Sequence, residues 1–384
     1  MDREGDRDMK VGIVKCENYD DVLAKLRECL DSIGGLGAFV KKGMKVALKV
    51  NLVMGKKPEV AATTHPLFVS ALCTLIDELG SESIIVESPG NLYKPEVLKG
   101  IYKITEMTKA VEGHNANLNF DVDSAEVENP DAVYLKKLAI LKPLTEADLI
   151  INLPKMKTHC QMVYTGAVKN MFGSIPGLAK MEMHFRMPDY SHFADTLIDI
   201  FLASKPKLSI MDGIVGMDGD GPTSGRVRNF GFILASENAF ALDYSAVKLM
   251  GIDPEKVRVL VNAEKRGLLD FKDSIEYPLL KIDDTTKIKD IKLPSSMNIH
   301  FAGGIIKNIA ESLIKPKVFF TDRCKACGYC AKICPAKAIT LVDKRPVADN
   351  KKCIRCFCCH ELCPHAAVEI KKNFIMSILS PHKN

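Results

Sequence analysis

Two runs of cysteines near the C-terminus place the strongest constraint on how this chain can fold. In each run four cysteines are separated by two, two and three residues, and a proline follows the last one; the runs are Cys324, Cys327, Cys330 and Cys334, and then Cys353, Cys356, Cys359 and Cys363. Three thiolates at this spacing can converge from a tight turn on the corners of one cluster, whereas the fourth lies out of reach. Each run therefore needs a cysteine from the other run.

This spacing is that of bacterial ferredoxins with two [4Fe-4S] clusters, in which the fourth cysteine of each run binds the other cluster. We assign one cluster to Cys324, Cys327, Cys330 and Cys363, and the other to Cys353, Cys356, Cys359 and Cys334. Structural zinc is a poorer match because it is satisfied by two separated cysteine pairs. A disulfide framework is poorer still, since no secretory signal precedes the cysteines. Cys358 lies outside the pattern and is expected to be a small buried side chain or a spare thiol.

The rest of the chain has an ordinary globular composition, with 47% hydrophobic and 26% charged residues overall. The net charge of +5 is modest, and no basic run is interleaved with aromatic residues, which argues against a nucleic-acid partner. A charged N-terminus and the lack of about eighteen consecutive apolar residues argue against a signal peptide and a membrane helix. We therefore expect a cytoplasmic protein with no membrane partner, and exposed clusters point to an anaerobic host.

Strand and helix patterns alternate through the first 260 residues or so. Apolar, β-rich runs predict strands at 11–14, 46–51, 84–87, 149–153, 208–211 and 230–235. Apolar residues three and four positions apart predict helices at 20–33, 65–79, 163–172, 191–202 and 239–250. This alternation indicates an α/β domain over residues 1–269, with a mostly parallel or mixed sheet flanked by helices.

The remaining residues are divided by their change in pattern. Residues 270–316 lose the alternation and are interpreted as an excursion and a connection, with a short helix ending near Ile314. Residues 317–371 are predicted to form a small α+β ferredoxin-like domain that holds both clusters, followed by a tail at 372–384. The two cysteine runs are 29 residues apart and form an internal repeat.

Basic residues follow the strand predicted at 149–153. Lys155, Lys157 and His159 alternate, so an extended backbone would place all three on one face, at the strand end where such sheets bind ligands. Charges gathered there repel each other unless an anion relieves them. The functional interpretation is a site for a carboxylate, a phosphate or a developing oxyanion, with Lys155 and His159 as catalytic candidates. The alternative is a solvated loop with ordinary surface lysines.

Three further segments contain candidate site residues. Lys169 and Asn170 lie between two glycines and could extend the anion site, or could be exposed helix residues. His184 and His192 flank a basic and aromatic segment, and we take His184 as a further catalytic candidate. Residues 212–225 are rich in glycine and aspartate, but a strand is predicted after them, which excludes the dinucleotide fingerprint. They are interpreted as a flexible acidic loop, a lid, a divalent-metal contact or a plain hairpin.

Taken in order, these motifs resemble the domain of unknown function 362 family. The segments that match are Lys49-Val50-Asn51, Thr64-His65-Pro66, Glu87 to Gly90, Asn152 to His159, Gly166 to Gly173 and Gly219 to Gly225, and the resemblance covers about residues 10–265. Val50 departs from the family pattern, which has proline there. The family often carries a C-terminal ferredoxin module and implies no single reaction. The resemblance implies that the polar segments form a shared cleft, with Lys49, Asn51, Lys157, Lys169 and Asn170 as substrate-binding candidates. Asp243 also matches the family pattern, without an assigned role.

The leading functional hypothesis is a reductase. An electron-donor protein would reduce the two [4Fe-4S] clusters, and the electrons would reach an anionic small molecule in the basic cleft. A second hypothesis is a non-catalytic electron carrier or assembly factor whose large domain docks a partner protein through a flat surface. A third is a metal or cofactor site built from His159, His184, His192 and the aspartates.

Overall fold

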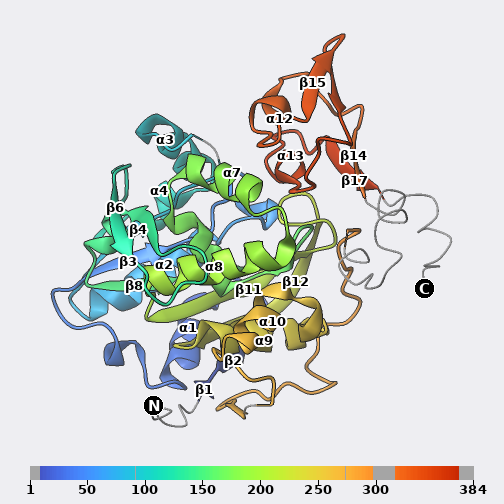
Figure 1. Cartoon of the computed structure of the whole chain (residues 1–384). Helices are drawn as coiled ribbons and strands as arrows, with labels where there is room; N and C mark the ends of the chain where they lie inside the picture. The colour runs from blue at the N-terminus through green and yellow to red at the C-terminus, as the bar shows by residue number, and fades with distance from the viewer. Residues whose placement is uncertain (1–8, 91, 273, 297–315, 372–384) are drawn as a thin grey trace.

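Within the residues that the structure describes (9–90, 92–272, 274–296 and 316–371), nine strands form the mixed sheet of the large domain. This computed structural model orders the strands β10-β9-β11-β8-β3-β4-β5, with β12 paired to both β11 and β2 (Figure 1). Neighbours from β9 to β5 run parallel, whereas β10, β12 and β2 join through antiparallel pairs. The strands are β2 (Gly12–Lys15), β3 (Lys45–Lys49), β4 (Glu82–Val86), β5 (Ala116–Leu118), β8 (Leu149–Asn152), β9 (Lys155–His159), β10 (Val163–Thr165), β11 (Leu208–Asp218) and β12 (Arg226–Ser236).

Helices cover both faces of this sheet, because successive residues of its strands face opposite layers. On β8, Leu149 and Ile151 belong to one apolar core and Ile150 to the other. The first core includes α1 (Val22–Asp31), α2 (Pro66–Glu78) and α3 (Pro95–Ile104), and the second includes α6 (Ala167–Asn170), α8 (Tyr190–Ser204), α9 (Ala239–Leu249) and α10 (Arg258–Lys265). The predicted α/β class of the large domain is therefore confirmed.

The remaining elements of the large domain are short or lie at its edges. They are α4 (Met107–Ala110), α5 (Lys142–Thr145), α7 (Gly177–Arg186), and the strand pairs β1 (Met9–Lys10) with β13 (Ile275–Glu276) and β6 (Ser124–Glu128) with β7 (Lys137–Leu141). Residues 289–295 run alongside the β11–β12 hairpin, where the Lys292 amide donates to Asp218 at 3.0 Å. The helix predicted to end near Ile314 lies outside the described residues. No helix in the described ranges is long and apolar enough to cross a membrane.

One predicted segment differs from the structure, and the alternatives for another are resolved. The helix predicted at 163–172 is wrong at its start, because residues 163–165 form β10 and pair with β9, and Gly166 then turns the chain into the short helix α6. Of the interpretations given for residues 212–225, the plain hairpin is the one observed, since Asp212 to Asp218 continue β11 and Arg226 begins β12. Two arginines of β12 hold Asp218: Arg226 at 2.7 Å and Arg228 at 3.5 Å.

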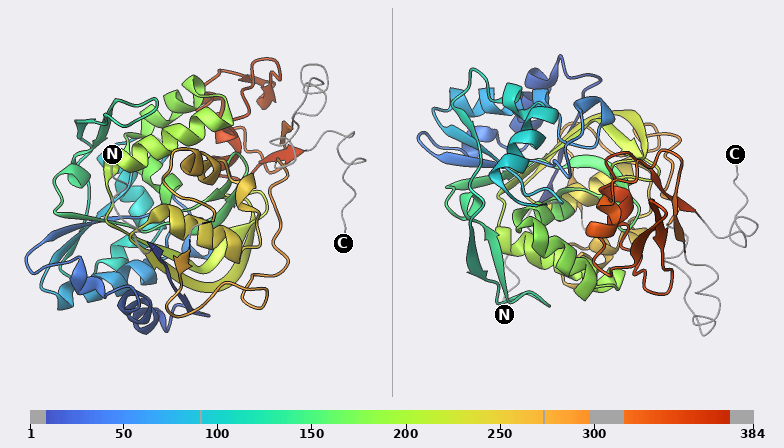
Figure 2. Two further views of the ribbon diagram at one scale, coloured as in Figure 1. Left: turned by 60° about the horizontal axis from the view of Figure 1, so that its bottom comes forward. Right: turned by 90° about the horizontal axis from the view of Figure 1, so that it is seen from above.

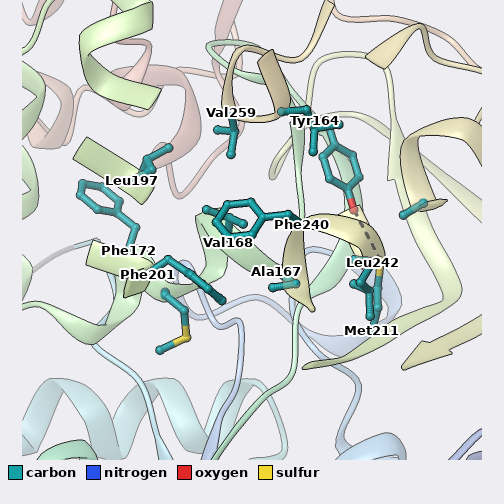
Figure 3. Packing of buried hydrophobic residues seen from close by; sticks show 14 of the residues in the cluster. Tyr164, Ala167, Val168, Phe172, Leu197, Phe201, Met211, Phe240, Leu242 and Val259 are labelled. Atoms are coloured by element: carbon teal, nitrogen blue, oxygen red, sulfur yellow. Dashed lines mark hydrogen bonds between the residues drawn. The ribbon is translucent and has the colours of Figure 1, made fainter. Parts of the chain in front are cut away.

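The short helix α6 is anchored deep in the second core. Figure 3 shows Ala167 and Val168 among apolar side chains from α8 and α9, including Leu197 and Phe240. Burying a side chain of the size of Val168 or Leu197 contributes about 1.5–3 kcal/mol, which helps to hold so short a helix in place. Asp243 on α9 also accepts the amides of Ala167 at 2.6 Å and Val168 at 3.0 Å. This contact gives Asp243 its role as the cap of α6.

The C-terminal module is a small α+β unit, as predicted. It comprises β14 (Lys317–Phe320) paired with β17 (Val368–Lys371), β15 (Ile339–Val342) paired with β16 (Arg345–Ala348), and the short helices α12 (Tyr329–Lys332) and α13 (Cys358–Glu361). Left-handed residues recur 29 positions apart, at Ala326 and Arg355, Gly328 and Phe357, and Lys337 and Ala366. The two halves of the module therefore share one backbone course.

The module packs on the large domain through α13 (Figures 1 and 2). The ring of His360 lies between two carbonyl oxygens, that of Val368 at 2.6 Å and that of Asp220 at 3.0 Å. The hydroxyl of Thr223 donates to the carbonyl of Glu361 at 2.7 Å. Leu362 fills the space beside Gly90, where an added Cβ would lie 2.8 Å from it.

Candidate functional site

The cysteines of the module surround two separate cavities. The first is lined by Cys324, Cys327, Cys330 and Cys363, and the second by Cys334, Cys353, Cys356 and Cys359. These are the two sets assigned from the spacing, with the fourth cysteine of each run crossing to the other set. We call them the outer set and the inner set, because Cys327 of the outer set is exposed and Cys359 of the inner set is buried.

The donor chemistry and spacing of both sets suit iron–sulfur clusters. In the described part of the chain, no three Cys, His, Asp or Glu side chains gather closely enough for a single metal ion, so the thiols are spread around each cavity. Backbone amides also point at the sulfur atoms: Ala338 donates to Cys334 at 3.2 Å and Ala367 to Cys363 at 3.3 Å. Such N–H···S contacts are a recognised way of tuning cluster potentials.

A third cavity, of about 70 Å³, lies where the module meets the large domain. We call it the polar cavity. Asn51 follows β3 and Glu87 follows β4, so it opens at the carboxyl ends of parallel strands, where such sheets bind ligands. The module contributes Cys358, Glu361 and Leu362 to its wall. Cys358, the thiol outside the cysteine pattern, is buried and lines both the polar cavity and the inner cysteine cavity.

The structure brings six of the eight cleft candidates together. Asn51, Lys157, His159, Lys169, Asn170 and His184 line the polar cavity, whereas Lys49 and Lys155 lie behind it. All five residues of β9 are buried. The alternative of a solvated loop with surface lysines at 155–159 is therefore wrong.

Lys155 is held by a carboxylate instead of facing a ligand. Its ammonium lies 2.6 Å from Asp212 of β11, and both side chains are fully buried. The hydroxyl of Tyr19 donates to the same carboxylate at 3.0 Å and accepts from Lys155 at 2.8 Å. The expected repulsion among the alternating basic residues is thus relieved at Lys155 by a protein carboxylate, which the sequence reasoning did not foresee.

Lys49 is neutralised in the same way. Its ammonium lies 3.1 Å from Glu87, and it also donates to the carbonyl of Asn170 at 3.0 Å. The pair leaves no room for a side chain at Gly173, where an added Cβ would lie 2.0 Å from the Glu87 carboxylate. Lys49 therefore shapes the wall of the polar cavity from behind.

A chain of side-chain amides fixes the floor of the polar cavity. Asn152 accepts from Asn170 at 2.8 Å, Asn170 accepts from Asn51 at 2.8 Å, and Asn51 accepts from Lys157 at 2.8 Å. Because each amide oxygen has a defined donor, the orientations of these side chains are set. Asn51 and Asn170 thus position Lys157.

Among the described residues, the side-chain amines of Lys157 and Lys180 donate only to neutral oxygens. Lys157 donates to Asn51 and to the carbonyl of Ala62, and Lys180 donates to the carbonyl of Ser88. Burial lowers the pKa of each lysine from 10.5 to about 7. Both groups can therefore gain or lose a proton near neutral pH.

His159 offers a hydrogen-bond donor to the polar cavity. Its Nδ1 accepts the backbone amides of Gln161 at 3.0 Å and Met162 at 3.3 Å, so the neutral ring carries its proton on Nε2. Nε2 is buried without a hydrogen-bond partner in the described part of the chain and lies 3.6 Å from Glu361. Burial, reinforced by the charge of Lys169, lowers the His159 pKa to about 4. His159 is thus a neutral donor at pH 7, which revises its expected part as a proton source.

Lys169 and Glu361 face each other across the polar cavity from different domains. Among the described residues we find no hydrogen bond or ion pair to the Lys169 ammonium, which lies 5.7 Å from the Phe172 ring centroid. Burial alone would raise the Glu361 pKa, but His159, Lys169 and His184 outweigh it and hold the pKa below its ordinary value. Glu361 is therefore ionised, and its charge partly offsets the burial that lowers the pKa of Lys157 and of Lys169.

His184 belongs to the cavity, and His192 does not. His184 stacks on Phe193 at 4.5 Å, burial lowers its pKa to about 3, and its Nδ1 has no partner in the described part of the chain. His192 is exposed beside Tyr134. A metal site built from His159, His184, His192 and the aspartates is not supported, since no group of three such side chains converges within the described ranges.

Sequence reasoning gave no site role to several polar residues of the cavity, among them Lys180, Glu361 and Ser88. Lys180 lies four positions before His184 on α7, so their shared helix face was a usable signal. Glu361 lies between two cysteines of the module, and nothing in the sequence around it indicated that it reaches the cavity. Ser88, whose buried hydroxyl has no partner in the described residues, was only quoted within a family motif.

Comparison with known proteins gives matches for both parts of the chain. Residues 46–248 match the family described as "Domain of unknown function (DUF362)", and residues 317–340 match a 4Fe-4S binding domain. The thylakoid-associated protein sll1697 of Synechocystis sp. is 31% identical over 295 residues, which are 74% of this chain and 89% of that protein.

Two solved structures are similar at low identity. The lactate racemase apoprotein of Thermoanaerobacterium thermosaccharolyticum has a TM-score of 0.41 at 13% identity, and a protein of Thermotoga maritima has 0.35 at 12%. The matches cover 65% and 61% of this chain and 59% of each of those two chains.

Proposed function

Because the chain belongs to the DUF362 family and, through its 4Fe-4S binding domain, is an iron–sulfur protein, we propose that it is a reductase of a small anionic molecule. Two [4Fe-4S] clusters, held by the outer and inner cysteine sets, would supply electrons one at a time. The observation that supports this proposal is the common wall formed by Cys358, which lines both the inner cysteine cavity and the polar cavity. We place this activity in the cytoplasm.

The proposal of an anionic substrate rests on groups that line the polar cavity and have no hydrogen-bond partner among the described residues. Lys169 offers an amine whose pKa burial lowers, so that a bound anion would favour its protonated form. His159 offers an N–H donor on Nε2. Buried donors without partners are costly, so a bound oxygen anion would stabilise them. The volume of about 70 Å³ favours a compact carboxylate or oxyanion over a nucleotide. Lys157 and Lys180, with pKa values of about 7, are the best placed groups to deliver the protons that accompany reduction.

The number of clusters can be tested by iron content. Anaerobically reconstituted protein should bind close to eight irons, since two clusters of four are proposed. Cys334→Ser should damage the inner cluster, whose other three ligands come from the second run. Cys363→Ser should damage the outer cluster, whose other three ligands come from the first run. Electron paramagnetic resonance of the reduced variants separates the two signals. If both substitutions damage the same signal, the assignment of the two sets is wrong.

The reductase itself can be tested with reduced methyl viologen as electron source and a panel of small carboxylates and oxyanions as acceptors. We expect at least one acceptor to reoxidise the dye in the presence of the protein. Lys169→Met should abolish that turnover while iron content stays at the wild-type level. Full turnover with full iron content in this variant would show that the polar cavity is not the substrate site.

The competing function, a carrier that docks a partner through a flat surface at residues 155–159, is less well supported. Every residue of β9 is buried beneath the module or the large domain. A protein partner cannot contact these side chains without separating the two domains.

A further inference from the structure

A groove of about 450 Å³ lies on the module between β14 and the β15–β16 hairpin. Figure 1 shows β15 on the side of the module away from the large domain, opposite to α13. Apolar side chains are exposed along it: Phe319 and Val347 line the groove at 42% and 50% exposure. Leu341 and Val342 of the hairpin are also about half exposed, at 46% and 52%. Exposed apolar side chains in a groove are typical of interaction sites.

The groove lies against the outer cysteine set. Cys324, Ala326 and Pro346 line both the groove and the outer cysteine cavity. The polar cavity, by contrast, adjoins the inner set through Cys358. The two ends of the module therefore face different surroundings, and the groove is at the end opposite to the substrate.

The module is also the basic part of the chain. Residues 317–371 contain eleven lysines and arginines against five aspartates and glutamates, an excess of six positive charges. Two oxidised [4Fe-4S] clusters with four thiolates each would offset about four of these, so the loaded module would remain weakly positive. Lys325, Lys344 and Arg345 are exposed beside the groove and the outer set. Asp322 and Asp343 also line the groove, and Arg345 lies 3.6 Å from Asp322. Electrostatic attraction thus comes from the module as a whole, and the apolar groove supplies the contact.

We propose that this groove docks an acidic electron-donor protein, which approaches the outer cysteine set. The proposal rests on the proposed reductase function and names the partner class for it. A positive module attracts a negative partner during diffusional encounter, and exposed apolar side chains near the outer set fix it in place. Each electron that leaves the reduced donor would reduce one cluster of the module, so the donor is oxidised as the module is reduced.

The test measures binding and electron entry separately. The probe is a small acidic two-cluster ferredoxin, and a basic cytochrome c of similar size serves as the contrasting partner. Affinity for the oxidised full chain is measured by calorimetry at about 0.15 M salt, where charges farther apart than about 8 Å are screened. The rate of cluster reduction by reduced ferredoxin is measured by stopped-flow absorbance, with dithionite as a small reductant that needs no docking.

The groove variant is Lys344→Glu with Arg345→Glu, and the matched control is Lys351→Glu with Lys352→Glu. The control makes the same change of charge on exposed residues of the same module that do not line the groove. We expect the groove variant to weaken ferredoxin binding and slow its electron transfer about tenfold or more, and the control less than about threefold. Val347→Ser should weaken binding by about threefold without any change of charge. Dithionite is itself an anion, so its reduction of the clusters should slow by a similar, smaller factor in the two charge variants and stay unchanged in Val347→Ser.

Equal weakening by the groove and control variants would overturn the proposal, because it would indicate unspecific attraction. So would tighter binding of cytochrome c than of ferredoxin. A dimer of the full chain that the groove variant dissociates would assign the groove to a second copy and would also overturn it. Failure of the proposed reductase is a different outcome. In that case Lys169→Met would leave turnover intact, while the groove variant would still weaken ferredoxin binding more than the control does.

Discussion

Buried lysines occupy two regions of this protein, and the two regions use them differently. In the first, Lys49 lies 3.1 Å from Glu87 and Lys155 lies 2.6 Å from Asp212. In the second, the polar cavity, Lys157, Lys169 and Lys180 form no ion pair with any described carboxylate. Lys155 and Lys157 are two residues apart on one strand, so residue type and position alone do not decide the role. The presence of a counter-charge decides it: the paired lysines are fixed by their carboxylates, and the unpaired ones remain available to a ligand.

The largest effect is expected when an ion pair of the paired region is broken. Asp212→Asn leaves Lys155 buried without its carboxylate and should lower the free energy of unfolding by about 3–5 kcal/mol. The measurement is anaerobic urea denaturation followed by far-ultraviolet circular dichroism, since the chain has no tryptophan. Asp284→Asn is the control, because Asp284 pairs with Lys287 at an exposed position and should have little effect. An Asp212 variant as stable as this control would show that the pair does not hold the fold.

The next effect belongs to the polar cavity. Sulfate serves as an anion probe, and Lys169→Met should weaken its binding by about thirtyfold. This factor corresponds to the loss of one charge-assisted contact of about 2 kcal/mol. Stability should change little, because Lys169 gives up no hydrogen bond or ion pair within the described residues. Calorimetry on the full chain gives the affinity, and the urea experiment gives the stability. Loss of stability with unchanged sulfate affinity would place Lys169 with the paired lysines.

The pH dependence of anion binding sharpens the contrast further. Lys157 and Lys180 have pKa values of about 7, lowered mainly by burial, and only their protonated forms attract an anion. Sulfate affinity should therefore be highest below pH 7 and fall about tenfold between pH 6 and pH 8, while sulfate itself keeps its charge. Lys180→Met should flatten this profile. A profile independent of pH in the wild-type protein would contradict the assignment of these lysines as titrating groups.

The smallest effect is expected for Tyr19, which contacts the Lys155–Asp212 pair of the paired region. Tyr19→Phe removes a hydroxyl that donates to Asp212 at 3.0 Å and accepts from Lys155 at 2.8 Å, and should cost about 1 kcal/mol of stability. Sulfate affinity should not change, because Tyr19 does not line the polar cavity. A change in sulfate affinity would mean that the two regions are coupled through β9.

The sequence predicted those features that depend on local pattern. Cysteine spacing predicted which thiols the structure gathers around each cavity, and apolar runs predicted most strands of the central sheet to within a few residues. The segment at 163–165 was assigned to a helix because its strand partner, β9, is known only from the fold. For the same reason the separation of Lys155 from Lys157 was not predictable. Asp212 lies 57 residues from Lys155, and Glu361 reaches the polar cavity from another domain.

The position of α13 has a consequence for chimeric proteins. Because Cys358, Glu361 and Leu362 complete the wall of the polar cavity, grafting a foreign ferredoxin domain with all eight cysteines would restore iron but not the pocket. A successful graft would have to keep these three side chains. It would also have to fit closely against Gly90, where there is no room for a side chain beside Leu362. The two domains therefore have to be inherited and engineered as one unit, although each has its own core.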